Sequence, residues 1–197
     1  MKDDFLSLVR KDISMGARKQ VLKNVLLDIK PDNIIVDCHR NGQQTTVEQA
    51  RIIDLDNVSY LPKPWCLKGM AVGNENWRSP EAHFRARLNK PTDTFSFSAV
   101  CIYAMLGRVI FGPDGDMQHI QSLGISPFLI RLQRQILCTL WEDRLVENIL
   151  YRSFYEWPDA VGLNPFFKDL VRQLISPDPK RRVTAREALE HPWFADV

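Results

Sequence analysis

The hexapeptide Asp-Ile-Lys-Pro-Asp-Asn at residues 28–33 leads directly into the apolar run of residues 34–36. A second apolar run, at residues 52–53, ends in Asp54, and an Asn-Gly pair lies at residues 41–42 between the two runs. Asn-Gly between two apolar runs is a strong signal for a β-hairpin. The sequence therefore predicts one hairpin whose open ends hold Asn33 and Asp54 near one another.

Further motifs follow in a fixed order along the chain. Trp-Arg-Ser-Pro-Glu ends at Glu81, Asp-Thr-Phe-Ser-Phe-Ser begins at Asp93, and Asp-Pro-Lys-Arg-Arg-Val-Thr contains Arg182. The chain closes with His-Pro-Trp-Phe. Together with the hexapeptide, these motifs resemble the eukaryotic-type protein kinases over about residues 19–194. The Asp-Ile-Lys-Pro form is similar to serine/threonine rather than tyrosine kinases.

The resemblance implies a role for each polar residue of the hairpin and its loop. Asp28 would act as the catalytic base that accepts the proton of a Ser or Thr hydroxyl, and Lys30 would neutralise charge on the transferred phosphoryl group. Asn33 and Asp54 would be the cofactor-binding residues, as ligands of the Mg²⁺ that accompanies ATP. Asp54 stands in Asp-Leu-Asp, where the family usually has Asp-Phe-Gly.

Other motif residues are expected to be structural. The resemblance implies that Arg182 pairs with Glu81, and that Asp93 opens a central buried helix and accepts backbone N–H groups of the catalytic loop. Trp77 is interpreted either as a core residue or as a residue that touches a bound peptide. Asn74 stands where the family usually has a Thr, beside the substrate site.

One part of the kinase pattern does not occur in these 197 residues. No Gly-x-Gly-x-x-Gly and no Val-Ala-Ile-Lys strand precedes Asp28, where Gly16 is the only glycine. We therefore expect residues 1–197 to form a single truncated kinase domain, the large C-terminal lobe, in which residues 1–18 are a poorly defined segment. The expected fold class is mainly α, a helical lobe with a small β-hairpin that carries the catalytic and metal motifs.

The segment just before the hexapeptide also departs from the family. Residues 14–26 are predicted to form a helix, because apolar residues at positions 21, 22, 25 and 26 share one face. A block of residues is interpreted as deleted between Val25 and Asp28, so that Leu26 and Leu27 either replace the usual His-Arg or end the shortened helix. Either alignment removes the basic residue that would bind an activation-loop phosphate, so switching by that route is not expected.

Two classes of function fit the sequence. The first is a serine/threonine kinase that acts on protein substrates, with little activity expected from this polypeptide alone, because the groups that position the ATP phosphates are not in it. The alternative is a catalytically dead lobe that binds a protein partner. In that case Leu26 and Leu55 would belong to an apolar cleft floor that faces water and marks a docking site.

Composition excludes several other classes. The net charge of +2, from 26 basic and 24 acidic residues, argues neither for nor against a nucleic-acid partner. The basic cluster at residues 180–182 is interpreted as a solvated approach to a helix with one structural Arg rather than a phosphate-binding patch, and we expect no nucleic-acid partner. Residues 99–111 are too short an apolar stretch to cross a bilayer and are interpreted as a buried helix, so we expect no membrane partner. The four cysteines lack Cys-x-x-Cys spacing and are interpreted as reduced thiols, which indicates an intracellular protein, cytoplasmic or nuclear.

Overall fold

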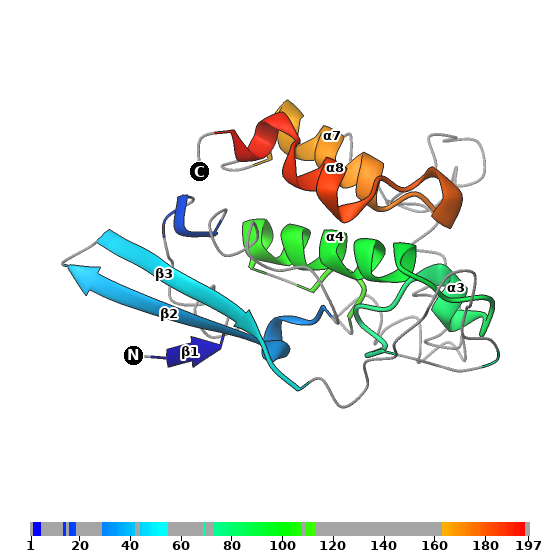
Figure 1. Cartoon of the computed structure of the whole chain (residues 1–197), viewed down its shortest axis with the longest axis horizontal. Coiled ribbons are helices and arrows are strands. Elements are labelled where there is room, and N and C mark those ends of the chain that lie inside the picture. Colours follow the sequence, from blue (N-terminus) through cyan, green and yellow to red (C-terminus); the bar gives the residue numbers. More distant parts are fainter. Residues whose placement is uncertain are drawn as a thin grey trace, which may run out of the picture.

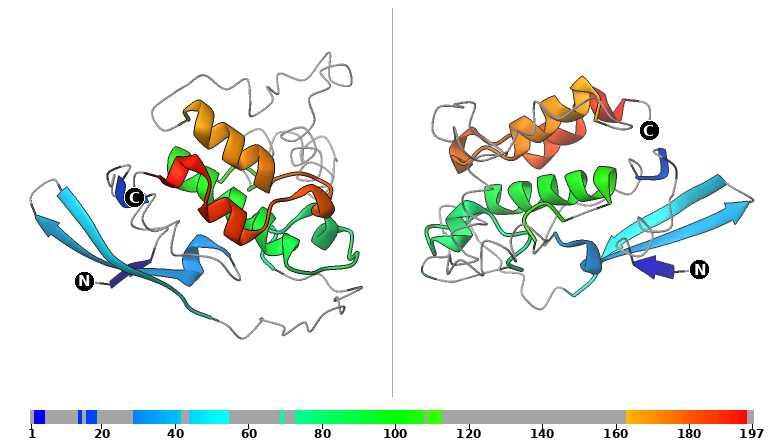
Figure 2. Two further views of the ribbon diagram at one scale, coloured as in Figure 1. Left: turned by 45° about the horizontal axis from the view of Figure 1, so that its top comes forward. Right: turned by 180° about the vertical axis from the view of Figure 1, so that it is seen from behind.

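The computed structural model describes residues 2–4, 14, 16–18, 29–41, 44–54, 69, 73–107, 109–112 and 163–195. Its layout is a small sheet on one side of a long central helix and a pair of shorter helices on the other side (Figure 1). The two views of Figure 2 show the same order of layers. The central helix is therefore enclosed by elements from both ends of the chain.

The predicted hairpin is present and carries both polar motifs at its open end. Strand β2 (Ile34–Asn41) pairs antiparallel with β3 (Gln44–Ile52), from Ile34 opposite Ile52 to Asn41 opposite Gln44. Only residues 42 and 43 separate the strands. The connection has the predicted length of two residues, but Asn41 of the Asn-Gly pair is the last residue of β2 and pairs with Gln44. A register shift between Asp37 and Cys38 marks a bulge in the ladder.

A third strand, β1 (Lys2–Asp4), pairs antiparallel with the other edge of β2 and gives the sheet order β1-β2-β3. No element was predicted for residues 1–13, because Lys2, Asp3 and Asp4 are all charged and show no strand pattern. Residues 16–18 are helical, which agrees with the predicted helix over 14–26; the rest of that prediction falls outside the described residues, apart from Ser14.

The central helix α4 (Pro91–Leu106) is buried on all sides from Thr94 to Met105. A helix that is apolar around its whole circumference belongs in the core of a domain. A buried helix is predicted over residues 99–111, but the helix ends at Leu106, five residues earlier. Gly107 takes a left-handed φ of 69° and its N–H donates to Tyr103 O at 2.8 Å, which terminates the helix. The last apolar residues still enter the core, and Phe111 stacks on Phe95 with ring centroids 5.9 Å apart.

The C-terminal layer consists of α7 (Pro165–Leu174) and α8 (Ala185–Leu189), with the 3₁₀ turns η5 (Pro179–Arg181) and η6 (Pro192–Phe194). Asn164 caps α7 by accepting the N–H of Phe167 at 2.8 Å. Thr184 and Glu187 form a reciprocal capping box at α8. Trp193 packs on Phe167 and so holds the end of the chain against α7.

Two predictions about the rest of the chain concern cysteines and membrane segments. Cys38 and Cys101 are buried free thiols, and Cys66 and Cys138 lie outside the described residues. Burial raises the pKa of the Cys101 thiol well above its ordinary value, so this group is inert. Within the described ranges, no helix combines the length and apolar character needed to cross a membrane.

Candidate active site

The loop before β2 is described from Ile29 onward, so the predicted base Asp28 lies outside the described residues. Lys30 precedes the 3₁₀ turn η1 (Pro31–Asn33), in which the proline occupies the first helical position, where its missing N–H has no cost. The N–H of Asn33 donates to Lys30 O at 3.0 Å and closes this turn. Asn33 is only 4% exposed. The turn thus holds Asn33 in a fixed place at the start of β2.

The end of β3 meets this turn directly. The N–H of Ile53 donates to Asn33 O at 2.8 Å, one residue beyond the Ile34–Ile52 pair, and Asp54 follows. Asp54 has a φ of 60°, a left-handed conformation that is uncommon for a residue with a side chain, although Asp adopts it more readily than most residues do. The predicted proximity of Asn33 and Asp54 is confirmed. Their roles as metal ligands stay a prediction.

Lys30 and Asp54 also face one another across the open end of the hairpin. Lys30 Nζ lies 3.8 Å from Asp54 Oδ2, and the side chains are 30% and 45% exposed. An ion pair with that much solvent contact stabilises a fold by only about 0–1 kcal/mol. The pair therefore contributes little to the stability of the fold. Its importance is that it places an ammonium group and a carboxylate at the site.

Asn33 and Asp54 suit a Mg²⁺ ion by their chemistry. Both offer oxygen ligands, and Mg²⁺ is usually held by one or two protein carboxylates together with water and substrate phosphates. Among the described residues, no group of three or more His, Cys, Asp and Glu side chains could form a metal site on its own. The pair fits a cation whose remaining ligands come from a nucleotide.

The segment before α3 (Pro80–His83) forms one wall of a pocket next to Lys30. Gly73 has a φ of 81°, and Arg78 donates from Nη2 to Gly73 O at 2.5 Å. Asn74 O accepts the N–H groups of Trp77 and Arg78, at 3.0 and 2.9 Å, and folds residues 74–78 into a turn.

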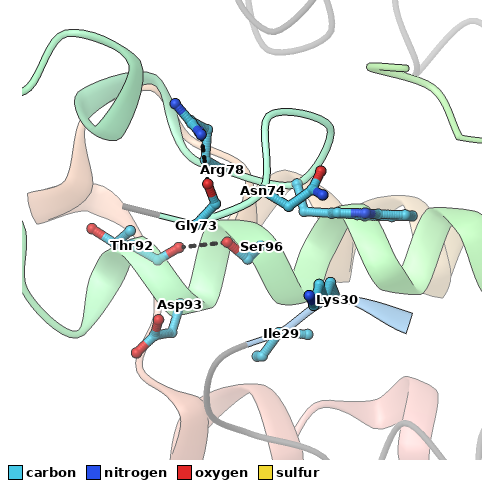
Figure 3. Close-up of a pocket in the computed structure, with 9 residues that line it drawn as sticks. Ile29, Lys30, Gly73, Asn74, Arg78, Thr92, Asp93 and Ser96 are labelled. Carbon is cyan, nitrogen blue, oxygen red and sulfur yellow. Dashed lines mark hydrogen bonds between the residues drawn. The ribbon is translucent and has the colours of Figure 1, made fainter. Parts of the chain in front are cut away.

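The pocket has an empty volume of about 400 Å³ with its open mouth, and Figure 3 shows the side chains around it. One wall comes from the loop that holds Lys30, another from residues 73–78, and the third from the first two turns of α4. Its lining residues are Ile29, Lys30, Gly73, Asn74, Trp77, Arg78, Thr92, Asp93 and Ser96. Asp93 thus lies beside the loop of Lys30, and its predicted hydrogen bonds to that loop stay a prediction.

Trp77 was interpreted in two ways, and its burial favours the core. It is 5% exposed, and its ring meets Tyr103 of α4 edge-on with centroids 5.7 Å apart. Packing of this kind fixes the wall of the pocket rather than offering a free aromatic surface.

The predicted pair of Arg182 and Glu81 is confirmed. Nη1 and Nη2 of Arg182 donate to Oε1 and Oε2 of Glu81 at 2.6 and 2.8 Å, in a bidentate arrangement. Thr92 Oγ1 adds a third bond to Glu81 at 3.1 Å. Burial alone would raise the pKa of Glu81, but the hydrogen bonds and charge of Arg182 outweigh it and lower the pKa. The pair anchors α3, and hence the pocket wall, to the C-terminal layer.

One surface of the site was missed by the sequence analysis. The face of the hairpin turned away from the core carries a hollow lined by Ile35, Asp37, Gln49, Arg51 and Ile53, and Ile53 is 40% exposed. These residues alternate with the buried ones along both strands. The two-residue period counted from Asn33 gives Ile35 and Asp37, and their partners across the hairpin are Arg51 and Gln49. Leu26 and Leu55, the predicted floor residues, lie outside the described residues.

Comparison with known proteins agrees with this geometry. Residues 22–194 match the family model described as "Protein kinase domain". The chain belongs to the protein kinase domain family. The kinase domain is 22% identical to the serine/threonine-protein kinase AFC2 of Arabidopsis thaliana over 88% of the chain and 49% of that protein.

Two other relatives are calcium/calmodulin-dependent kinases. Type IV of Homo sapiens is 36% identical over 47% of the chain and 20% of that protein. The kinase cmkB of Emericella nidulans is 20% identical over 98% of the chain and 41% of that protein. The kinase domain spans about half the length of these relatives or less. The prediction of a serine/threonine protein kinase relationship is confirmed.

Proposed function

We propose that residues 1–197 form the large lobe of a serine/threonine protein kinase, which transfers the γ-phosphoryl group of ATP to protein Ser or Thr hydroxyls. The observation that carries the proposal is the convergence of Lys30, Asn33 and Asp54 at the open end of one hairpin. These side chains come from two motifs about twenty residues apart in sequence, in the order that protein kinases have them.

Each residue has a separate task in the proposed reaction. The substrate hydroxyl oxygen forms a bond to the γ-phosphorus while the bond from that phosphorus to the ADP oxygen breaks, and the hydroxyl proton passes to the Asp28 carboxylate. Lys30 stabilises the negative charge of the phosphoryl oxygens. Asn33 and Asp54 would hold Mg²⁺, which neutralises charge on the phosphates when it is bound.

The outward face of the hairpin is the proposed floor for the ATP base. Ile35 and Ile53 lie within one or two residues of the ends that carry Asn33 and Asp54, so the hollow adjoins the phosphate-binding groups. Apolar surface beside a few convergent polar groups is typical of small-molecule sites.

Full activity also needs groups that cover the ATP phosphates. We propose that such groups come from a longer form of this chain or from another chain, and that the 197-residue polypeptide alone transfers phosphate slowly. Positioning of reactants supplies roughly 7–11 kcal/mol in well-oriented reactions, so an uncovered site forfeits much of its rate.

The test is phosphoryl transfer from radiolabelled ATP to Ser, Thr and Tyr peptide pools by the longest natural polypeptide that contains these residues. Asp28→Asn should reduce transfer to Ser and Thr by about 10²–10⁴-fold, the usual contribution of a general base. Asp32→Asn, at an exposed carboxylate of the same loop, is the matched control and should leave transfer unchanged. Undiminished transfer by Asp28→Asn, or no transfer by the native protein, would favour the protein-binding alternative.

A further inference from the structure

The outer edge of β2, on the side away from β3, is only partly filled by the chain's own strand. β1 pairs with Ile35, Val36 and Asp37 and runs alongside β2 (Figure 1). β2 continues to Asn41, and within the described ranges no strand pairs with this edge beyond Asp37. The backbone groups of a strand edge are a template for pairing with another strand. The edge of β2 can therefore accept a longer strand than β1.

The sequence of β1 makes it a weak strand. Its three residues, Lys2, Asp3 and Asp4, are all charged, and both Asp and Lys are depleted in strands. Among the described residues, β1 also has no strand on its other side. A segment with better strand formers would therefore compete with β1 for the same edge.

The register defines what such a segment should carry. Val36 is 0% exposed and Cys38 is 4% exposed, whereas Asp37 lies between them on the outward face, where it lines the hollow of the hairpin. Residues directly opposite one another in an antiparallel pair share a face of the sheet, so apolar residues opposite Val36 and Cys38 and a basic residue opposite Asp37 would match β2. The register of β1 places Lys2 opposite Asp37 but Asp3 opposite Val36. β1 therefore meets this pattern at one position and breaks it at another.

The same edge adjoins the candidate active site. β1 lies close to η1, the turn that holds Asn33, as well as to β2. The pairing of Asp4 with Ile35 begins only two residues after Asn33. A strand on this edge would therefore lie next to the segment that positions Asn33.

We propose that the outer edge of β2 is a docking site for an extended segment of a partner protein, which displaces β1 and adds a strand to the sheet. Backbone hydrogen bonds to β2 supply the affinity, and the residues opposite Val36, Asp37 and Cys38 supply the specificity. This inference goes beyond the proposed function and does not depend on it, because strand pairing needs neither ATP nor a metal ion.

The test titrates the full 197-residue protein with the end-blocked synthetic peptide Thr-Thr-Thr-Val-Lys-Val-Thr. In antiparallel pairing with residues 35–41, its two valines stand opposite Cys38 and Val36 and its lysine stands opposite Asp37. Amide chemical shifts in nuclear magnetic resonance spectra give the dissociation constant and the contacted residues, and we expect the largest changes at residues 35–41. Asp3→Pro weakens β1 and should tighten peptide binding, whereas Asp3→Val strengthens β1 and should weaken it, each by about two- to fivefold. Equal affinities of these two variants would overturn the proposed displacement of β1.

A charge exchange tests the register. Asp37→Lys should weaken binding of this peptide, and a peptide with Glu in place of its Lys should restore it, because opposite charges that face one another across two strands attract. Glu190→Lys makes the same charge change at an exposed residue of the C-terminal layer and should leave the affinity unchanged. If Asp37→Lys fails to fold, the Glu peptide should still bind the native protein about two- to fivefold more weakly than the Lys peptide does. The proposal would be overturned by absent binding to both the native protein and Asp3→Pro, by shifts centred away from β2, or by equal affinities of the two peptides for the native protein.

Discussion

At the scale of single residues, Arg182 is the best-satisfied charged group of the described chain. Besides its two bonds to Glu81, its guanidinium donates to the carbonyl oxygens of Ser176, Pro177 and Pro91. All five N–H donors of the side chain are thus used, and its exposure is 0%. The same group lies over the ring of Phe95 at 5.1 Å. Arg182 therefore joins α3 and the start of α4 to the segment that follows α7.

Replacing Arg182 by Met should destabilise the fold by about 3–5 kcal/mol, because Glu81 would remain as a buried charge without its partner. The double variant Arg182→Met with Glu81→Leu should recover most of this loss, since no charge is then stranded. Urea unfolding measures the free energies. Arg181→Met, at the exposed neighbouring residue, is the control and should change the free energy by less than about 0.5 kcal/mol. Equal losses for the Arg181 and Arg182 variants would contradict this role.

Acid should weaken the same pair. The pKa of Glu81 is lowered in the fold from its ordinary value of 4.5, so its contribution is complete above pH 4.5 and is lost as pH falls through the lower folded value. The free energy of unfolding should therefore decrease below pH 4.5, and more steeply for the native protein than for Glu81→Gln. Urea unfolding between pH 3 and pH 6 gives the slopes, and parallel slopes would refute the assignment.

Asp169 adds to this acid sensitivity. Burial alone would raise its pKa, but hydrogen bonds from His191, Arg172 and Gln173 outweigh that effect and lower the pKa from 3.8. His191 Nδ1 accepts the N–H of Trp193, so Nε2 carries the proton that is donated to Asp169 at 3.2 Å. The contribution of Asp169 is complete above pH 3.8 and is lost as pH falls through its lower folded pKa, so the free energy of unfolding should decrease less steeply below pH 3.8 in Asp169→Asn than in the native protein.

At the scale of elements, the central helix has a sharp end that depends on one glycine. Gly107 has a left-handed φ of 69°, and a Cβ atom there would meet no other atom within 4 Å. Any cost of a side chain at this position therefore comes from the backbone conformation and not from a clash.

Gly107→Ala should cost about 1 kcal/mol of stability, and Gly107→Asn less, because Asn tolerates the left-handed region better. Gly16→Ala is the matched control. Gly16 lies in the helical residues 16–18 with equally open space around it, so Ala there should be neutral or stabilise by up to about 1 kcal/mol. Thermal unfolding of both variants measures the two effects, and a loss of equal size at both positions would contradict the backbone explanation.

The hairpin and the end of the central helix show which features of the secondary structure can be predicted from the sequence. The strands were predictable because Asn-Gly and two apolar runs are local signals. The helix end was predicted too late because residues 109–111 are apolar and continue into the core after the helix has stopped. Strand β1 was not predictable, since three residues acquire strand geometry only from the edge of β2.

At the scale of the whole molecule, contacts between residues that are far apart in sequence hold the walls of the site in position. Arg182 and Glu81 lie 101 residues apart, and their pairing was predicted only because the motif order identified a family. The turn that begins at Asn74 was not predictable, because it depends on the hydrogen bond from the N–H of Asn76 to Asn74 Oδ1, which forms only in the folded chain. Arg18 likewise donates to Ala104 O at the end of the central helix, a contact that no local pattern indicates.

The most direct test of the account is thermal unfolding of the protein with and without Mg²⁺ and ATP. At 100 times its dissociation constant, a ligand that binds only the folded state adds about 2.7 kcal/mol, or roughly 5–10 °C for a chain of this size. We expect such a shift for the native protein and for Glu190→Gln, at an exposed carboxylate of the C-terminal layer. We expect a much smaller shift for Asp54→Asn. No shift in the native protein, or an equal shift in Asp54→Asn, would contradict the proposed nucleotide and metal site.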